Sequence, residues 1–266
     1  MSSNGLRAEV LPDVGSHPDR LVPLEAVHNF RDLGGYPTAD GRVTKWRTLF
    51  RADGLYRLAG DDLEVIRRLG LKTVIDLRMD AELAERGRFP EAEHPVAFHH
   101  LTVLDTTWAE MDRPEFDDDA DFLHWAYHQM LASGGPNFGA AINVLAGDAA
   151  LPAVFHCAAG KDRTGITAML VLGALGVPKD YIAADYALTE AGMERMRVWA
   201  EREFPELAGQ AADVPSAFFA ALPAAMSRLI DDLVARHGSV RAFVRTLGVS
   251  EASLVALDAA LLDDPA

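Results

Sequence analysis

The sequence predicts an α/β fold in which a mostly parallel sheet of about four or five strands is flanked by helices and followed by an all-helical C-terminal portion. Short β-branched runs alternate with helical segments as far as residue 178, and a strand followed by a helix is the unit of a parallel sheet. After that point only helical patterns remain. Hydrophobic residues form 49% and charged residues 24% of the 266 residues, the balance of a globular protein with a core.

Four stretches of the first part are apolar or β-branched and end at charges or turns, which predicts strands. They are residues 43–50, 72–78, 96–104 and 152–156. Helical patterns alternate with them at residues 61–69, 80–86, 121–131 and 136–146. An acidic run at 115–121 indicates a solvated loop that caps the third of these helices. Residues 164–175 are apolar almost all round, which predicts a buried helix that Gly176 and Pro178 end.

The C-terminal portion, from about residue 178, carries four further helical patterns, at residues 181–204, 216–237, 240–247 and 250–262. Gly238 and Gly248 supply breaks between them. Residues 1–23 contain two prolines and a glycine near their middle and are expected to form a loosely held N-terminal arm. We therefore expect a single domain over residues 24–266.

The charge of the chain limits its partners. Twenty-five Lys and Arg against forty Asp and Glu give a net charge of −15, which repels nucleic acid and anionic membranes unless a local basic pocket overrides it. No apolar run is long enough for stable membrane insertion, and the opening residues lack the regions of a signal peptide, so a cytoplasmic location is expected. Export by another route stays open. One cysteine allows no internal disulfide. The sequence gives no indication of the oligomeric state.

That cysteine, Cys157, lies in the stretch FHCAAGKDRTGIT, between the last predicted strand and the buried helix. The first amides of a helix have no internal partners and carry the positive end of its dipole, so this junction suits an anion. A loop formed by Ala158, Ala159, Gly160 and Lys161 can curl its N–H groups around a phosphate, because glycine permits the torsions that such a loop needs.

The same positive field stabilises a thiolate, which makes Cys157 a nucleophile without a dedicated base. Arg163 can pair two phosphate oxygens through its planar guanidinium. Thr164 can hydrogen-bond the sulfur when it leaves in a second step. The nucleotide-binding loop Gly-x-x-x-x-Gly-Lys-Ser/Thr is excluded, because Asp162 stands where Ser or Thr is required. These residues together indicate covalent phosphoryl transfer through a phosphocysteine rather than a small core cysteine.

The run HCAAGKDRTG resembles the Cys-x5-Arg signature loop of the cysteine-dependent protein tyrosine phosphatase superfamily. Its Lys-Asp version is similar to that of the atypical bacterial tyrosine, dual-specificity and lipid phosphatases of the PtpB type. The resemblance covers about nine-tenths of the chain and extends to NFRDLGGY, LFRADGL, VIDLRMDAE and HGSVRAFVRTLGVSE. It implies the fold of these phosphatases and hydrolysis of phosphate monoesters without a cofactor.

By this resemblance Cys157 is the nucleophile and Arg163 binds phosphate and stabilises the transition state. Lys161 matches a loop lysine shared with phosphoinositide phosphatases, where it accommodates extra phosphates. Asp162 matches the acid often proposed for the PtpB type. The chain lacks the Trp-Pro-Asp loop that carries the general acid of eukaryotic tyrosine phosphatases.

Three carboxylates therefore compete for the role of general acid, which must reach the leaving oxygen and still hold its proton. Asp162 is adjacent to the phosphate by sequence and is the first choice. Asp105 follows the strand that would precede a mobile acid loop in related folds, and Asp80 follows the strand ending at Leu77, at the carboxyl edge of the sheet. For each, the alternative is an aspartate that caps a turn.

Several histidines have simpler interpretations than catalysis. His124 and His128 lie four apart on a predicted helix, a spacing that can bind zinc, but no third ligand is evident and we predict no metal. His99 and His100 must point to opposite faces of a strand. His156 is expected to orient the loop by hydrogen-bonding its backbone.

Four charged residues near strand ends, and one helical stretch, leave two interpretations open. Arg31 and Asp32 either line the substrate or form an internal ion pair, which we favour. Arg51 and Arg78 are either secondary phosphate ligands or internal partners of Asp53 or Glu82. Residues 181–220 either close over the site as a lid or pack into the core, which we favour. That stretch contains four large apolar side chains, Met193, Met196, Trp199 and Phe204.

The leading substrate class is phosphotyrosine in proteins, with phosphoserine, phosphothreonine and phosphoinositides as further candidates. A dedicated phosphoinositide phosphatase is the alternative that Lys161 favours, although the charge of −15 offers no basic face for a membrane. A phosphate-binding pseudophosphatase without turnover is the alternative from another class, and the intact Cys157 and Arg163 speak against it.

Overall fold

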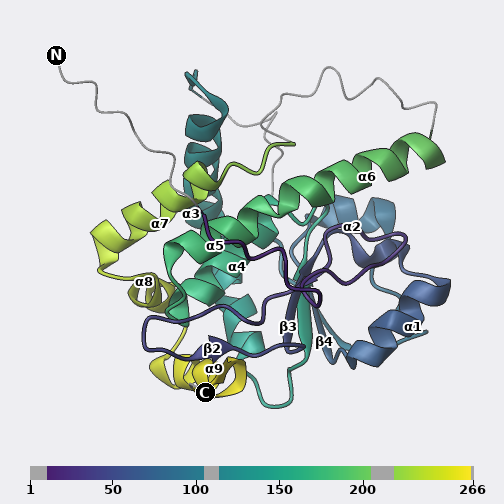
Figure 1. Ribbon diagram of the computed structural model, residues 1–266, viewed down its shortest axis with the longest axis horizontal. Helices are drawn as coiled ribbons and strands as arrows, with labels where there is room; N and C mark the ends of the chain where they lie inside the picture. The colour runs from purple at the N-terminus through teal and green to yellow at the C-terminus, as the bar shows by residue number, and fades with distance from the viewer. Residues whose placement is uncertain (1–10, 105–113, 205–218, 265–266) are drawn as a thin grey trace.

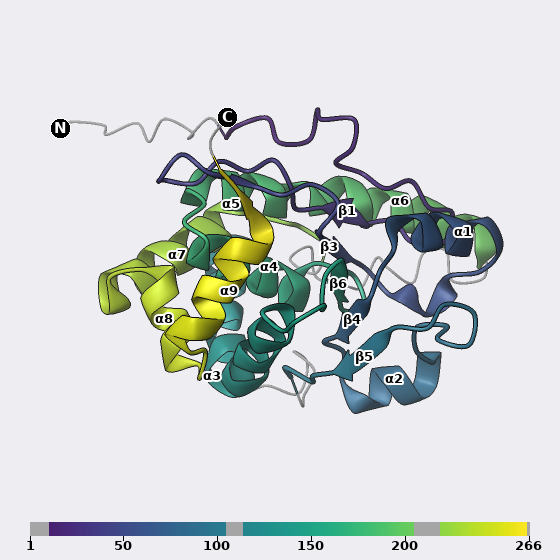
Figure 2. The ribbon, with the colours of Figure 1, turned by 90° about the horizontal axis from the view of Figure 1, so that it is seen from below.

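The computed structural model describes residues 11–104, 114–204 and 219–264. A five-stranded sheet forms its centre in the order β1-β3-β6-β4-β5 (Figures 1 and 2). The strands are β1 (Arg31–Asp32), β3 (Leu49–Ala52), β4 (Thr73–Asp76), β5 (Ala97–His100) and β6 (Ala153–His156). Four of them are parallel, and β1 pairs with β3 in the antiparallel sense. The expected mostly parallel sheet is confirmed.

Helices cover both faces of this sheet, as Figures 1 and 2 show. On one side lie α1 (Gly60–Leu69) and α2 (Asp80–Arg86). On the other lie the longer helices and the helical C-terminal part: α3 (Asp119–Leu145), α4 (Asp162–Ala174), α5 (Lys179–Ala187), α7 (Pro223–His237), α8 (Val240–Thr246) and α9 (Glu251–Leu261). A short 3-10 helix, Leu55–Arg57, and α6 (Thr189–Glu203) complete the described helices.

The strands alternate their side chains between two cores, because successive residues of a strand point to opposite faces. On β6, Ala153 and Phe155 enter the large core under α3, α4 and the C-terminal helices, whereas Val154 enters the smaller core under α1. Ile75 and Val74 of β4 divide in the same way. Both faces of the central strands are therefore buried, which explains their continuous apolar sequence.

Several predicted elements agree with the structure, and their signals were local. α1 ends at Gly70, which adopts the left-handed conformation with φ of 68° that a helix C-terminus favours. α2 spans the predicted residues. At the start of α3, Asp118 accepts a hydrogen bond from the backbone N–H of Asp121 at 2.8 Å, so the acidic run caps the helix as expected.

Other boundaries were wrong for reasons of packing. The predicted helices at 121–131 and 136–146 are one helix, α3, which continues through Pro136. Gly134 and Gly139 let it approach the carbonyl groups of Val103 and Leu247 so closely that a Cβ atom would lie 2.5 Å and 2.0 Å from those oxygens. Tertiary packing therefore maintains the helix across residues that usually end one.

The predicted strand at 43–50 is two strands separated by a turn, in which Arg47 has a positive φ of 58°. Its first part, β2 (Val43–Thr44), leaves the main sheet and pairs with β7 (Leu262–Asp263) at the end of the chain. The C-terminal portion is therefore not wholly helical. The stretch 181–204 divides into α5 and α6 at Leu188, and α7 begins at Pro223, since proline suits the first turn of a helix.

The described part of the N-terminal segment is anchored rather than loosely held. Val14 is buried in the large core. Arg20 donates to the carbonyl oxygens of Val14 and Asp32, at 3.0 Å and 2.6 Å, and its guanidinium stacks on the ring of Tyr36. These contacts attach Val14 and Arg20 to the described core.

Candidate active site

The loop that carries Cys157 joins β6 to α4 at the carboxyl edge of the parallel strands, where ligands of such sheets collect. β6 ends at His156, and α4 begins at Asp162 with its amide end toward the loop. The Cys157 side chain is only 2% exposed. The structure thus brings the only thiol of the chain to the positive end of a buried helix.

The carbonyl groups of the loop point away from its centre. The N–H of Gly54 donates to the carbonyl of Ala158 at 3.0 Å, and the side-chain amide of Asn29 donates to those of Ala159 and Gly160 at 3.3 Å and 3.0 Å. In a trans peptide the C=O and the following N–H point in opposite directions. The amides that follow these carbonyls therefore face the inside of the loop, where an anion would lie.

Gly160 is required by the tightness of this turn. Its φ is 66°, in the left-handed region, and a Cβ atom there would lie 2.6 Å from the carbonyl oxygen of Ala52. Only glycine fits both conditions. The glycine that the sequence analysis singled out is thus needed for the loop to rest against the end of β3.

Arg163 is held by a residue that the sequence analysis did not assign to the site. Both of its terminal nitrogens donate to the two carboxylate oxygens of Glu82 on α2. Burial alone would lower the pKa of Arg163, but its electrostatic interactions with Cys157 and Glu82 outweigh this effect, so the pKa lies above its ordinary value. The sequence offers Glu82 only as a partner of Arg51 or Arg78, and the signals for its place near the site are its position after the strand and its inclusion in VIDLRMDAE.

Thr164 and Lys161 are both buried in the loop. Among the described residues the hydroxyl of Thr164 has no hydrogen-bond partner, which leaves it available to a sulfur or a phosphate. The ammonium of Lys161 is 1% exposed and lies 3.5 Å from a carboxylate oxygen of Asp162. The carbonyl of Lys161 accepts the N–H of Gly165, the first bond of α4.

Asp162 has a second partner of a kind that the sequence did not reveal. The hydroxyl of Tyr127 on α3 donates to its carboxylate at 2.8 Å, and the hydroxyl of Tyr186 on α5 contacts that of Tyr127. Burial and the nearby carboxylate raise the pKa of Tyr127 well above its usual value, so it stays a donor. The Asp162 side chain is 21% exposed, which leaves one side of it open to a substrate.

The other two acid candidates are placed differently. Asp80 is 90% exposed and lies beside His100 and Thr102, at 3.6 Å and 3.2 Å, in the first turn of α2. Asp105 lies outside the described residues.

Under the loop, His156 and Arg78 are fully buried. Burial lowers the pKa of His156, so its imidazole is neutral, and its Nδ1 donates to the carbonyl of Cys157 at 3.2 Å. Arg78 pairs with Asp76 at 2.6 Å, so it has an internal partner, although not Asp53 or Glu82, the two that the sequence offered. Arg78 therefore braces the end of β4.

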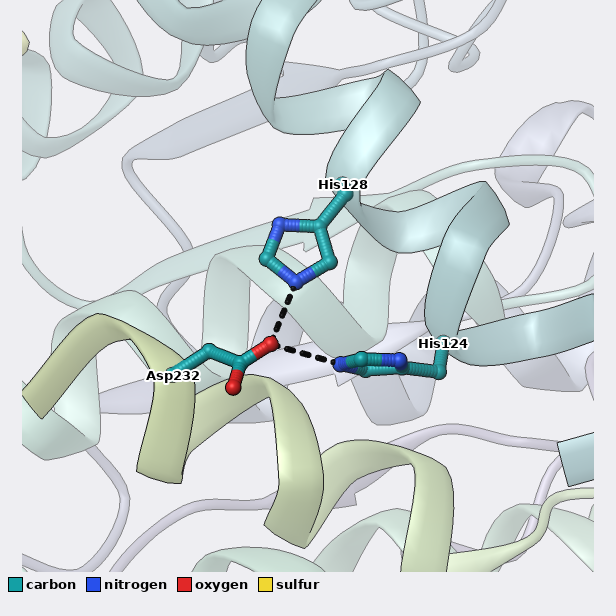
Figure 3. A group of neighbouring side chains, drawn as sticks. All are labelled: His124, His128 and Asp232. Carbon is teal, nitrogen blue, oxygen red and sulfur yellow. Dashed lines mark hydrogen bonds and ion pairs between the residues drawn. The ribbon is translucent and has the colours of Figure 1, made fainter. Parts of the chain in front are cut away.

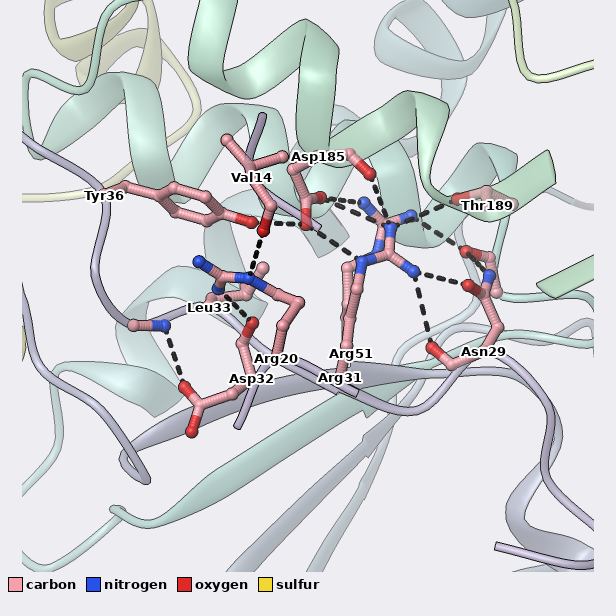
Figure 4. A network of polar contacts seen from close by, with 12 residues as sticks. Val14, Arg20, Asn29, Arg31, Asp32, Leu33, Tyr36, Arg51, Asp185 and Thr189 are labelled. Carbon is pink, nitrogen blue, oxygen red and sulfur yellow. Dashed lines mark hydrogen bonds and ion pairs between the residues drawn. The ribbon is translucent and has the colours of Figure 1, made fainter. Parts of the chain in front are cut away.

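A buried network of polar side chains is centred on Asp185 of α5 and reaches the loop through Arg51 (Figure 4). Its carboxylate pairs with Arg31 at 2.9 Å and with Arg51 at 2.6 Å, and it accepts the hydroxyl of Tyr36 at 2.8 Å. Arg51 continues to the carbonyl of Gly160 at 2.8 Å. Arg31 therefore has the favoured internal role, but its ion-pair partner is Asp185 and not Asp32. Of the two interpretations left open for Arg51, the internal one fits the structure, with Asp185 in place of Asp53 or Glu82.

The stretch expected as a lid or as core is α6 with the residues around it. The first part of the stretch packs into the large core through Ile182 and Tyr186. Of its four large apolar side chains, Met193, Met196 and Trp199 are half-buried and Phe204 is exposed. Gly192 lies against Asn29, which in turn holds the loop carbonyls. Residues 205–218 lie outside the described part of the chain.

Comparison with known proteins points to one family. A family model described as the tyrosine phosphatase family matches residues 22–263. A protein of Cupriavidus necator with a tyrosine-protein phosphatase name is 34% identical over 172 residues, and the match covers 62% of this chain and 61% of that protein. The triple specificity protein phosphatase PtpB of Mycobacterium tuberculosis is 30% identical over 90% of this chain and 98% of its own length. A tyrosine-protein phosphatase of Nostoc commune is 29% identical over 76% of this chain and 69% of its own.

None of the helices within the described residues is long and apolar enough to cross a membrane. The resemblance noted from the signature loop is confirmed by the extent of these matches, one of which runs over nearly the full length of a relative. The chain belongs to the tyrosine phosphatase family, a family of phosphoric monoester hydrolases within the cysteine-dependent superfamily.

Proposed function

We propose that the protein hydrolyses phosphotyrosine in proteins through a phosphocysteine on Cys157, with phosphoserine, phosphothreonine and phosphoinositides as further substrates. The observation that carries this proposal is the loop itself, whose carbonyls are held outward so that its amides surround the space above a buried thiol. Such donors stabilise the charge of a transferring phosphoryl group without rearranging.

In the first step the thiolate of Cys157 attacks phosphorus while the bond from phosphorus to the leaving oxygen breaks. Arg163 and the loop amides bind the equatorial oxygens, and Asp162 gives its proton to the leaving oxygen. In the second step water attacks phosphorus and passes a proton to the Asp162 carboxylate as the sulfur–phosphorus bond breaks. The Thr164 hydroxyl donates to the departing thiolate, and phosphate is released.

Two features support the choice of Asp162 as the acid. It is in the loop beside the bound phosphate, and its carboxylate has an open side. Tyr127 donates to one oxygen, which leaves the second to carry the proton. Asp80 points to His100 and Thr102 and serves as a matched control.

The experiment measures phosphate release from a phosphotyrosine peptide and from a panel of phosphoinositides, with wild-type protein and Cys157→Ser. We expect release from the peptide that disappears in the variant, together with a trapped phosphoenzyme on rapid quenching of the wild type. Absence of turnover on every substrate would favour a phosphate-binding module. A strong preference for phosphoinositides would favour the lipid enzyme that Lys161 suggests.

The role of Asp162 is tested with two aryl phosphates that differ in leaving-group basicity. Asp162→Asn should lose about 10²- to 10⁴-fold in kcat on the poor leaving group and much less on the good one, because only the basic oxygen needs a proton. Asp80→Asn should match the wild type on both. Equal losses of Asp162→Asn on the two substrates would exclude it as the acid.

A further inference from the structure

A second group of side chains with ligand chemistry joins α3 to α7. We propose that His124, His128 and Asp232 bind one Zn²⁺ ion, which links these two helices. The sequence offered only the histidine pair, and the third donor that it lacked is supplied by tertiary packing.

The three donor atoms already converge (Figure 3). His124 and His128 lie one turn apart on the same face of α3, and the Nε2 atom of each is 2.9 Å from Oδ2 of Asp232. One ligand atom from each of the three residues can be chosen so that all lie within 4.8 Å of one another. The carboxylate oxygen of Asp232 thus already lies beside both imidazoles, so a cation bound at this point would have all three side chains as ligands.

The dimensions fit zinc after a small adjustment. Zinc takes tetrahedral nitrogen and oxygen ligands at about 2.0 to 2.2 Å, which places neighbouring ligand atoms roughly 3.3 Å apart. The two nitrogen–oxygen separations of 2.9 Å need to open by about 0.4 Å, and the two imidazole nitrogens need to come to a similar distance from each other, since the three ligand atoms lie within 4.8 Å of one another. The side chains are 19%, 23% and 38% exposed, so water can reach the fourth position. Two imidazoles with one carboxylate favour zinc over calcium or magnesium, which prefer oxygen.

Binding requires a change of tautomer. Both imidazoles now donate an Nε2 hydrogen to the carboxylate, which can only accept. Coordination through Nε2 moves each proton to Nδ1 by exchange with water, so neutral imidazoles bind with no net release of protons.

The surroundings are compatible with an added cation. Arg228 lies one turn before Asp232 on α7, and its charge is matched by Asp121 of α3 at 2.6 Å. This ion pair is a second cross-link between the same two helices, and it contributes no metal ligand. The net charge of −15 also favours cations at long range.

The test uses Cys157→Ser protein, because the active-site thiolate of the wild type is itself a zinc ligand. After treatment with a chelator, Zn²⁺ is titrated by calorimetry and Co²⁺ is followed by its visible spectrum. We expect one site per chain, a tetrahedral Co²⁺ spectrum, and a Tm raised by about 5 to 10 °C at free zinc a hundred times the Kd.

Three further variants in the same background decide the assignment. His124→Gln and His128→Gln keep an N–H donor toward Asp232 but remove a metal ligand, so each should weaken zinc binding at least tenfold, by analogy with losses caused by outer-shell changes. Arg228→Gln breaks the neighbouring ion pair and should keep the zinc affinity. Melting in chelator shows whether each variant folds. Absence of one-to-one binding, or full zinc affinity in both histidine variants, would overturn the proposal.

Discussion

Asp185→Asn should strongly destabilise the protein, because it removes the one negative charge between two buried guanidinium groups. Arg31 and Arg51 are 3% and 0% exposed, and Asp185 itself is 1% exposed. Burial alone would raise the pKa of Asp185, but the two arginines hold it far below its ordinary value, so the carboxylate is charged. An asparagine of nearly the same shape leaves the two positive charges unmatched.

The hydrogen bonds make the replacement worse. One carboxylate oxygen accepts from Arg31 and Tyr36, and the other accepts from Arg51. Whichever oxygen becomes an amide NH₂ group then faces a guanidinium donor. Breaking a buried ion pair on one side costs about 3 to 5 kcal/mol. At roughly 2 to 4 °C per kcal/mol, Tm should fall by about 6 to 20 °C.

Urea unfolding followed by circular dichroism measures this effect, and Asp231→Asn is the matched control. Asp231 of α7 pairs at 2.9 Å with Lys179 of α5, the helix that carries Asp185, but the Asp231 side chain is 57% exposed. Loss of an exposed pair should cost less than about 1 kcal/mol. If the free energies of unfolding of the two variants differ by less than about 1 kcal/mol, the network does not support the loop as we argue.

Glu82→Gln should lower kcat/KM about tenfold or more, because a charge-assisted bond to Arg163 contributes about 1.5 to 3 kcal/mol. Glu85→Gln, on the exposed side of the same helix, should leave kcat/KM unchanged. Equal kcat/KM values for the Glu82 and Glu85 variants would contradict a role of Glu82 in holding Arg163. Gly160→Ala should lower the free energy of unfolding in urea by about 1 to 3 kcal/mol and remove most of the turnover. The reason is that residue 160 has a φ of 66° and its Cβ would lie 2.6 Å from a carbonyl oxygen of β3. Wild-type turnover in this variant would disprove the close approach. Burial, and after it the charges of Arg57 and Arg195, lowers the pKa of His28 from 6.5 to about 4. Between about pH 4 and pH 6.5 His28 therefore binds a proton in the unfolded chain but not in the folded one. Stability should therefore rise with pH from about 4 to 6.5, and His28→Gln should flatten this rise in unfolding at about pH 5 and pH 7, whereas an unchanged slope would refute it.

Where the sequence misplaced an element, a distant contact decided the outcome. Gly134, Gly135 and Pro136 resemble a helix break, yet α3 passes through them because its glycines pack against the segment that follows β5 and against the end of α8. The stretch 43–50 contains the β-branched and aromatic residues of a strand, but the chain turns at Arg47 and its first part pairs with residues 262–263. No pattern within either segment carries that information.

The sequence by itself determined the layered α/β fold and the loop from Cys157 to Thr164. Both follow from local order. Strand and helix periods set the layers, and a strand, a tight glycine turn and a buried helix bring a thiol and an arginine six residues apart to one loop, where we propose that phosphate binds. Only the tertiary structure decided which charges meet. Arg163 finds Glu82 across 81 positions, Arg51 finds Asp185 across 134, and His124 finds Asp232 across 108. With 25 basic and 40 acidic side chains, sequence spacing allows many pairings, and the packing of helices against strand ends selects among them.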